Sequence, residues 1–153
     1  AVGRVLPCRR KAGEGTTGEG RTIQIKNQIM NLDLFERYKG VTGVYWFEFG
    51  KTVAYVGKAN CILSRVKSHK NRFSGYSKFK ALSCNKYTEN LSYLDATCFL
   101  KLCECYFIED LNPIENKTRV SFMENWRKSV ITHKRVYHLI DEVLSINDRM
   151  RLQ

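Results

Sequence analysis

The sequence predicts an α/β (α+β) fold in which a small, three-stranded, mostly antiparallel sheet is flanked by helices. Two short runs rich in β-branched and aromatic residues, 43–49 and 53–58, are separated by a glycine-containing turn, which is typical of a β-hairpin. Apolar residues then recur at helical spacing over 60–73. A second helical pattern covers 97–116 and supplies the other flank of the sheet.

The remaining elements are expected from local patterns. Asn60 is the expected N-cap of the first helix, and Gly75 marks its end. Residues 91–96 are the candidate third strand, 22–26 can add a further short strand, and 29–38 has helical spacing.

The chain divides into three parts. At 153 residues it is long enough for one domain with its own core. Residues 1–21 hold five of the ten glycines and are expected to form a flexible basic tail. Residues 22–116 form the expected domain. Residues 117–153 are expected to form two amphipathic helices, separated near Thr132, that pack on the domain.

The net charge of +11, with an isoelectric point near 9.5, favours a polyanionic partner, nucleic acid before a membrane surface. Most of the excess lies between positions 51 and 90, where nine basic residues stand against Glu89 alone. The cations expected to contact nucleic acid are Lys58, Lys67, Lys70, Arg72, Lys78 and Lys80.

The basic stretch 76–90 allows two interpretations. Lysines alternate there with Tyr76, Phe79 and Tyr87. Such aromatic residues suit a surface that follows a nucleic acid strand, because rings stack on bases while lysines meet phosphates. They equally suit an ordinary loop whose aromatic residues anchor it to the core, and the sequence does not decide between the two.

The six cysteines do not indicate a disulfide framework or a zinc site. Cys98, Cys103 and Cys105 lie in an apolar segment, as buried thiols do, and no paired Cys-x-x-Cys spacing occurs. No apolar run has the length of a membrane span. We therefore expect no membrane partner and an intracellular protein, cytoplasmic or nuclear.

Glu104 lies among apolar residues on the predicted second helix. A carboxylate in such a position is costly unless it is paired with a cation or binds a metal. On the first helix, Arg65 and His69 are four residues apart and are expected to project from one face. A structural ion pair and a metal site are the two explanations for Glu104.

Together these residues resemble the GIY-YIG nuclease superfamily. Gly43-Val44-Tyr45 stands in the place of the first triplet and Tyr55-Val56-Gly57 in the place of the second. The downstream residues that match in order and spacing are Arg65, His69, Glu104, Pro113 and Asn116. The resemblance covers roughly residues 41–116, and it departs from the common pattern at Lys58 and Glu115.

The resemblance implies a catalytic set made of Tyr45, Tyr55, Arg65, His69, Glu104 and Asn116, with Gly43 and Gly57 as structural glycines. It also implies that one tyrosine activates water while the others orient it, and that Asn116 supports the site. Glu109, on the other side of the helix, is expected to be solvated.

The residue types fit phosphodiester hydrolysis. One carboxylate, Glu104, can hold Mg²⁺, which keeps several waters and takes phosphate oxygens as its other ligands; Mn²⁺ can substitute. Arg65 can grip the attacked phosphate. Tyr45, Tyr55 and His69 are the candidate bases, with Tyr45 preferred.

The expected function is therefore a Mg²⁺-dependent endonuclease that acts on DNA, as a monomer or homodimer. One alternative is a non-catalytic nucleic-acid-binding module that keeps the fold. Another is a protein-interaction domain in which the basic stretch is incidental.

Overall fold

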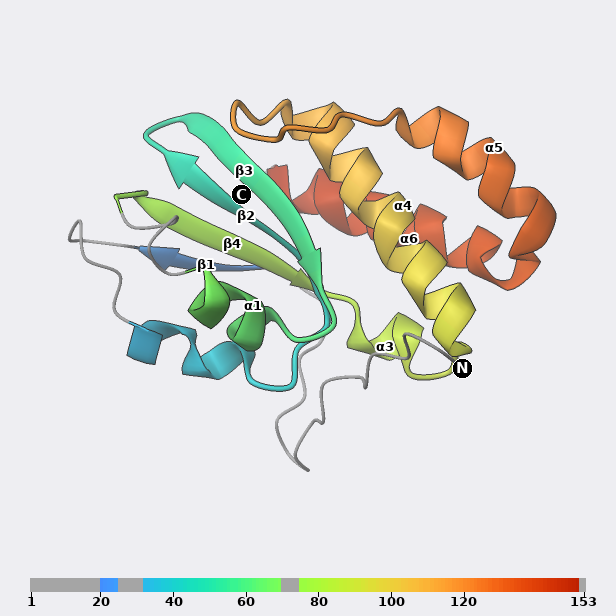
Figure 1. Ribbon diagram of the computed structural model, residues 1–153, viewed down its shortest axis with the longest axis horizontal. Helices are drawn as coiled ribbons and strands as arrows, with labels where there is room; N and C mark the ends of the chain where they lie inside the picture. The colour runs from blue at the N-terminus through green and yellow to red at the C-terminus, as the bar shows by residue number, and fades with distance from the viewer. Residues whose placement is uncertain (1–19, 25–31, 70–74, 152–153) are drawn as a thin grey trace.

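The computed structural model describes residues 20–24, 32–69 and 75–151 (Figure 1). The predicted tail 1–21 therefore lies outside the described residues except for its last two positions. The elements, in chain order, are β1 (Gly20–Gln24), the 3₁₀ helix η1 (Leu32–Tyr38), β2 (Gly43–Phe49), β3 (Thr52–Ala59), α1 (Ile62–Ser68), β4 (Lys78–Ser83), α3 (Asn85–Thr88), α4 (Tyr93–Leu111), α5 (Phe122–Thr132), the 3₁₀ helix η2 (Lys134–Val136) and α6 (Tyr137–Arg151).

The predicted fold class is confirmed. Strands β2, β3 and β4 form a three-stranded antiparallel sheet, and β1 extends it to four strands in the order β1-β4-β2-β3. The predicted hairpin is β2–β3, in which Tyr45 pairs with Gly57. β3 is consequently an edge strand of this sheet.

The position of the third strand was predicted wrongly. Residues 91–96 lie at the start of α4, because the Ser92 hydroxyl accepts the N–H of Asp95 and caps that helix. The third strand is β4, inside the stretch expected to be a connector. Its burial alternates at first, with Phe79 and Ala81 buried and Lys78 and Lys80 only partly so.

The sheet separates two apolar clusters, because successive side chains of a strand point to opposite faces. Val44, Trp46 and Val56 pack toward α4 and α6. Tyr45, Phe47 and Phe79 pack toward η1 and α1. Figure 1 shows α4 and α6 on one side of the sheet and α1 on the other.

The aromatic residues of 76–90 anchor that stretch to the core. Phe79 is fully buried and Tyr87 is 4% exposed. Tyr76 packs on the cluster that contains Phe47, with ring centroids 5.4 Å apart. Of the two interpretations left open by the sequence, the structure supports the loop-anchoring one for these rings.

Both flanking helices differ from their predicted bounds. α1 begins after Cys61 rather than Asn60 and ends at Ser68, while residues 70–74 of the predicted helix lie outside the described part. α4 ends at Leu111, and Asn112 adopts a left-handed conformation, with φ of 49°, that terminates it.

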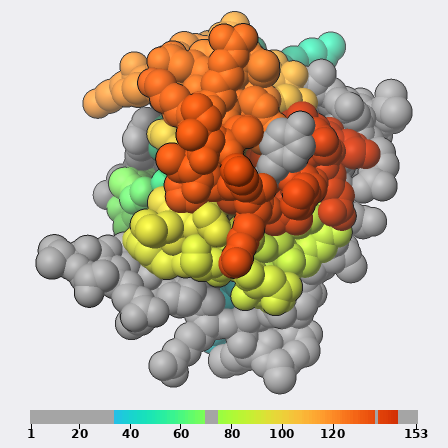
Figure 2. Space-filling model, turned by 90° about the vertical axis from the view of Figure 1, so that its right-hand side faces the viewer, coloured from blue at the N-terminus to red at the C-terminus, as the bar shows by residue number. Residues whose placement is uncertain are grey.

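The two C-terminal helices both pack against α4. Val136, Ile140 and Val143 join the core cluster of β2 and α4, and Lys86 of the α3 turn forms an ion pair with Glu142 at 2.8 Å. Figure 2 shows α5 and α6 covering one side of the molecule, beside α3 and the start of α4. Within the described ranges, no helix combines the length and apolar character needed to cross a bilayer.

The five cysteines in the described part of the chain are free thiols. Burial raises the pKa of Cys103 well above its usual value, and the neighbouring Cys84 adds to this effect.

Candidate active site

Part of the predicted site set lies along the edge strand β3, namely Tyr55, Lys58, Arg65, Glu104 and Asn116. Because no described strand pairs with β3 on its outer side, side chains from α1 on one face and α4 on the other can approach the same edge. Two neighbouring cavities lie there, one of about 610 Å³ and one of about 250 Å³.

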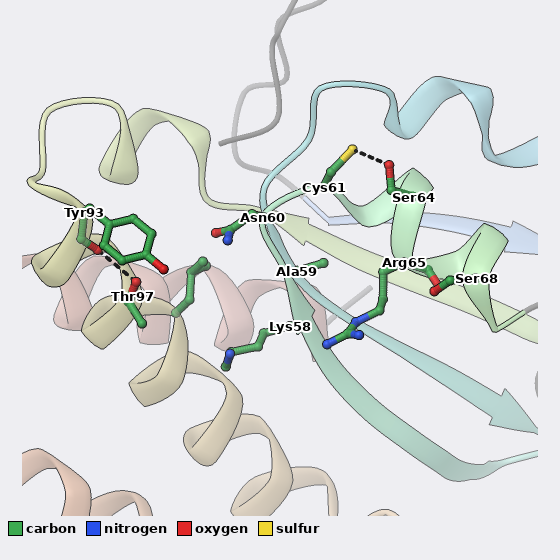
Figure 3. Close-up of a pocket in the computed structure, with 10 residues that line it drawn as sticks. Lys58, Ala59, Asn60, Cys61, Ser64, Arg65, Ser68, Tyr93 and Thr97 are labelled. Carbon is green, nitrogen blue, oxygen red and sulfur yellow. Dashed lines mark hydrogen bonds between the residues drawn. The ribbon is translucent and has the colours of Figure 1, made fainter. Parts of the chain in front are cut away.

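The larger cavity contains the cations of the site. Figure 3 shows Lys58 reaching into it from β3 and Arg65 from α1. None of its described lining residues is acidic. Among the described residues, neither Lys58 nor Arg65 forms an ion pair. The lining residues are Lys58, Ala59, Asn60, Cys61, Ser64, Arg65, Ser68, Tyr93, Thr97 and Leu100.

The smaller cavity contains the carboxylate of the site. Tyr55 and Val56 of β3, Glu104 of α4 and Asn116 of the following segment all line it. The Glu104 side chain is 16% exposed, and its Oε1 lies 3.3 Å from Nζ of Lys101 on the same helix. Glu104 is therefore an accessible carboxylate whose partner is the exposed end of a flexible side chain.

Arg65 and Glu104, which the resemblance assigns to one catalytic set, line two different cavities in the structure. Arg65 lines the larger and Glu104 the smaller. The two cavities are lined by neighbouring residues of the same two elements: Leu100 and Lys101 on α4, and Tyr55, Val56, Lys58 and Ala59 on β3.

The Cys105 thiol lies beside charges from both α4 and β3. Burial raises the pKa of this thiol, Lys101 lowers it, Glu104 raises it, and Lys58 lowers it.

The two tyrosines of the triplets differ in accessibility. Tyr45 is 1% exposed and lies between Phe79 and Tyr55, with ring-centroid distances of 5.8 and 6.4 Å. Tyr55 is partly exposed and lines the Glu104 cavity. Of the two tyrosines, Tyr55 thus lines the cavity that contains the carboxylate, whereas Tyr45 lines neither cavity.

Both structural glycines allow a close approach. A Cβ added at Gly57 would lie 2.6 Å from the Tyr45 hydroxyl oxygen and 3.0 Å from Cε1 of Tyr55. One added at Gly43 would lie 2.0 Å from the backbone oxygen of Leu82. Gly57 therefore leaves room for the two phenol rings, and Gly43 for the pairing of β2 with β4.

Asn116 supports the edge strand. Its Oδ1 accepts the N–H of Val56 at 3.0 Å, and its Nδ2 donates to the Val56 carbonyl at 2.9 Å. The preceding N–H groups of Ile114 and Glu115 donate to the carbonyls of Val53 and Ala54. The segment 114–116 thus satisfies the outer polar groups of β3 beside Tyr55.

Several predicted residues take other positions. His69 follows the last residue of α1, is partly exposed and lines neither cavity. Lys67 pairs with Glu36 at 3.4 Å and Lys80 with Glu48 at 3.2 Å, so acidic partners offset the charges of both. Lys78 lies in β4, and Lys70 and Arg72 lie outside the described residues.

Sequence reasoning missed three contacts near the site. Lys101 was not identified as the partner of Glu104, although its spacing of three residues was a signal. Glu109 is exposed, as expected, but its carboxylate accepts the first N–H of α5, from Phe122, at 2.7 Å. Buried Asn85 accepts the Thr42 N–H and donates to the Gly40 carbonyl, which fixes the chain just before β2. No local signal in the sequence pointed to Asn85.

The residues present fit a magnesium ion with one protein ligand. No three His, Cys, Asp or Glu side chains of the described residues come together as a metal-binding group. Mg²⁺ usually retains several waters and takes one or two carboxylates plus substrate phosphates, and the cavity beside Glu104 has room for such waters.

Comparison of the chain with protein-family models, with curated proteins and with solved structures found no match.

Proposed function

We propose that the chain is a Mg²⁺-dependent endonuclease that hydrolyses phosphodiester bonds of DNA, as its resemblance to the GIY-YIG nucleases implies. The observation that carries the proposal is the arrangement along β3. A cavity lined by Glu104 and Tyr55 lies beside a cavity lined by Lys58 and Arg65, whose described lining contains no acidic residue.

Glu104 is the residue that would hold the metal. Mg²⁺ bound there would supply positive charge to the phosphate under attack. For this the carboxylate must separate from Lys101, and the cost is small because a pair of charges three or four residues apart on one helix contributes only about 0.2–0.5 kcal/mol.

Arg65 and Lys58 would bind the phosphates of the strand. The guanidinium of Arg65 is always charged and can form two parallel hydrogen bonds to one phosphate, whereas Lys58 offers a point charge. With no acidic residue among the described lining of their cavity, both charges remain available to the substrate.

Tyr55 is better placed than Tyr45 to orient or deprotonate the attacking water. A general base must come within hydrogen-bond reach of the proton it takes, and Tyr55 lines the cavity whereas Tyr45 is almost fully buried. The sequence-based preference for Tyr45 is therefore reversed in this proposal. Tyr45 then supports Tyr55 by packing against its ring.

Cleavage of supercoiled plasmid DNA in Mg²⁺ tests the proposal. Glu104→Gln and Arg65→Ala should each lower the cleavage rate by at least about 100-fold, because each removes charge stabilisation from the transition state. Salt-sensitive binding of DNA should persist in Glu104→Gln.

Matched controls are available on α5. Glu124, like Glu104, pairs with a lysine of its own helix, at 3.1 Å, and Arg127 is exposed. Glu124→Gln and Arg127→Ala should leave cleavage unchanged. Equal activity of Glu104→Gln and Glu124→Gln would refute the assignment of the metal ligand.

A non-catalytic nucleic-acid-binding module is the second candidate, and the Lys101–Glu104 ion pair favours it. A carboxylate neutralised by its own helix needs no metal. This candidate requires DNA binding without cleavage in either Mg²⁺ or Mn²⁺, and binding that Glu104→Gln does not change.

A further inference from the structure

We infer that the larger cavity, between β3, α1 and the start of α4, binds one nucleotide of a DNA strand, with the phosphate at Lys58 and Arg65 and the base against Tyr93. The inference rests on the proposed function. It extends that function from the attacked phosphate, held by Arg65, to the rest of the nucleotide that carries it, for which the sequence alone indicated no binding residue.

One wall of the cavity suits a phosphate. Lys58 from β3 and Arg65 from α1 both line it (Figure 3), and the described lining contains no carboxylate to offset them. The hydroxyl groups of Ser64 and Ser68 donate instead to Cys61 Sγ and to the Arg65 carbonyl. Two cations beside an open space are contacts that position a nucleic acid backbone.

The opposite wall suits a base. Tyr93 is the first residue of α4 and is 40% exposed, and Figure 3 shows its ring extending into the space opposite Arg65. An exposed ring beside a phosphate site offers a stacking surface that any base can use. Thr97, one turn further on, donates its hydroxyl to the Tyr93 carbonyl at 2.8 Å and keeps its acceptor capacity.

Asn60 adds a polar group that fits the edge of a base. Its carboxamide extends toward Tyr93 (Figure 3) and lines the cavity. Among the described residues the amide has no hydrogen-bond partner, whereas its backbone carbonyl accepts from Thr42. A carboxamide both donates and accepts hydrogen bonds, as base edges do.

The volume of the cavity fits this occupant. About 610 Å³ lies within the range of roughly 300–1,000 Å³ typical of sites for small organic ligands. A phosphate group alone would occupy only the cationic wall and leave the ring and carboxamide unused. The combination therefore favours a whole nucleotide over an isolated anion.

The test measures binding without cleavage, in Ca²⁺ or EDTA. Fluorescence anisotropy is followed for labelled single-stranded oligonucleotides in which one abasic position is moved along the strand. For the unmodified protein, one position should weaken binding about 5- to 150-fold, the range expected for loss of one stacked base.

Tyr93→Ala should weaken binding of the intact oligonucleotide by a similar factor and should abolish the effect of the abasic position. Tyr93→Phe keeps the ring and should behave like the unmodified protein. Phe49→Ala is the matched control, because Phe49 is an exposed aromatic residue, 64% accessible, that lines neither cavity. If Tyr93→Ala does not fold, Thr97→Val and the abasic series on the unmodified protein provide the same test.

Competition distinguishes a nucleotide from a simple anion. Thymidine monophosphate should displace the oligonucleotide at concentrations at which inorganic phosphate does not. Equal displacement by both, or identical affinities of Tyr93→Ala and Phe49→Ala with no sensitive abasic position, would overturn the inference. Cleavage that depends on Glu104 would still support the proposed function in that case. A Tyr93-dependent nucleotide site in a protein without cleavage would leave the inference standing and remove the proposed catalysis.

Discussion

Gly57→Ala should damage both the stability of the protein and its proposed active site. The added Cβ would lie 2.6 Å from the Tyr45 hydroxyl oxygen, 2.7 Å from Cζ of Tyr45 and 3.0 Å from Cε1 of Tyr55. Tyr45 cannot easily move inward, because it is 1% exposed and stacks on Phe79. Tyr55 is partly exposed, so the strain should be relieved by displacing its ring into the Glu104 cavity.

The cost of such overpacking is about 1–3 kcal/mol of unfolding free energy. For a chain of this length that corresponds to a decrease of the melting temperature of about 2–12 °C. Urea and thermal unfolding followed by circular dichroism measure the loss, and plasmid cleavage at a temperature where both proteins are folded measures the effect on the site.

Two variants separate the ring contact from a general loss of stability. Gly50 has a φ of 62° and open space at its Cβ position, so Gly50→Ala should cost about 1 kcal/mol through backbone strain without affecting cleavage. Tyr45→Phe removes the nearest atom and should make Gly57→Ala less costly when the two are combined. An unchanged melting temperature of Gly57→Ala, or strict additivity of the pair, would refute the reasoning.

Three further predictions follow from contacts around the site. Asn116→Ala removes two hydrogen bonds to Val56 and should lower the free energy of unfolding by about 1–3 kcal/mol. Hydrogen exchange at the Val56 amide should become faster. Unchanged exchange at this amide would contradict the supporting role of Asn116. Lys101→Met frees the Glu104 carboxylate and should tighten Mn²⁺ binding at least about twofold, as measured by electron paramagnetic resonance. Lys128→Met on α5 should leave Mn²⁺ binding unchanged. Weaker Mn²⁺ binding by Lys101→Met would exclude Glu104 as the ligand. Burial raises the pKa of Cys103, so the folded protein retains this proton longer than the unfolded chain. Stability should therefore be retained below about pH 8.5 and decrease above it, by at most about 1.4 kcal/mol per pH unit for this thiol. Cys103→Val should show a shallower decrease in urea unfolding between pH 8 and 10, and identical slopes would exclude the thiol as the cause.

The elements that the sequence predicted well are those with strong local signals. The hairpin β2–β3 follows from two β-branched and aromatic runs around Gly50, and α4 from its long apolar spacing. The prediction put the third strand at 91–96, but Ser92 and Asp95 form the N-terminal cap of α4 there. The true third strand, 78–83, was predicted as a connector because its lysines make the segment polar. The alternation of lysines with Phe79 and Ala81 in this segment was the signal for a strand.

The placement of three candidate residues could be anticipated from the sequence, but the shape of the candidate site could not. The resemblance selected Arg65, Glu104 and Asn116, and the structure places all three along the β3 edge. The separation into two cavities depends on how α1 and α4 flank that edge, which no local pattern encodes. The burial of Tyr45 likewise depends on packing against Phe79, which is 34 positions away in the chain (79 minus 45).

The docking of 114–116 on β3 also limits how this protein can self-associate. Ile114, Glu115 and Asn116 occupy polar groups of Val53, Ala54 and Val56 on the outer border of β3. An incoming chain therefore finds fewer free groups to pair with along this part of the sheet edge. A proteolytic product that ends before Pro113 would lose this protection and should be more prone to aggregate.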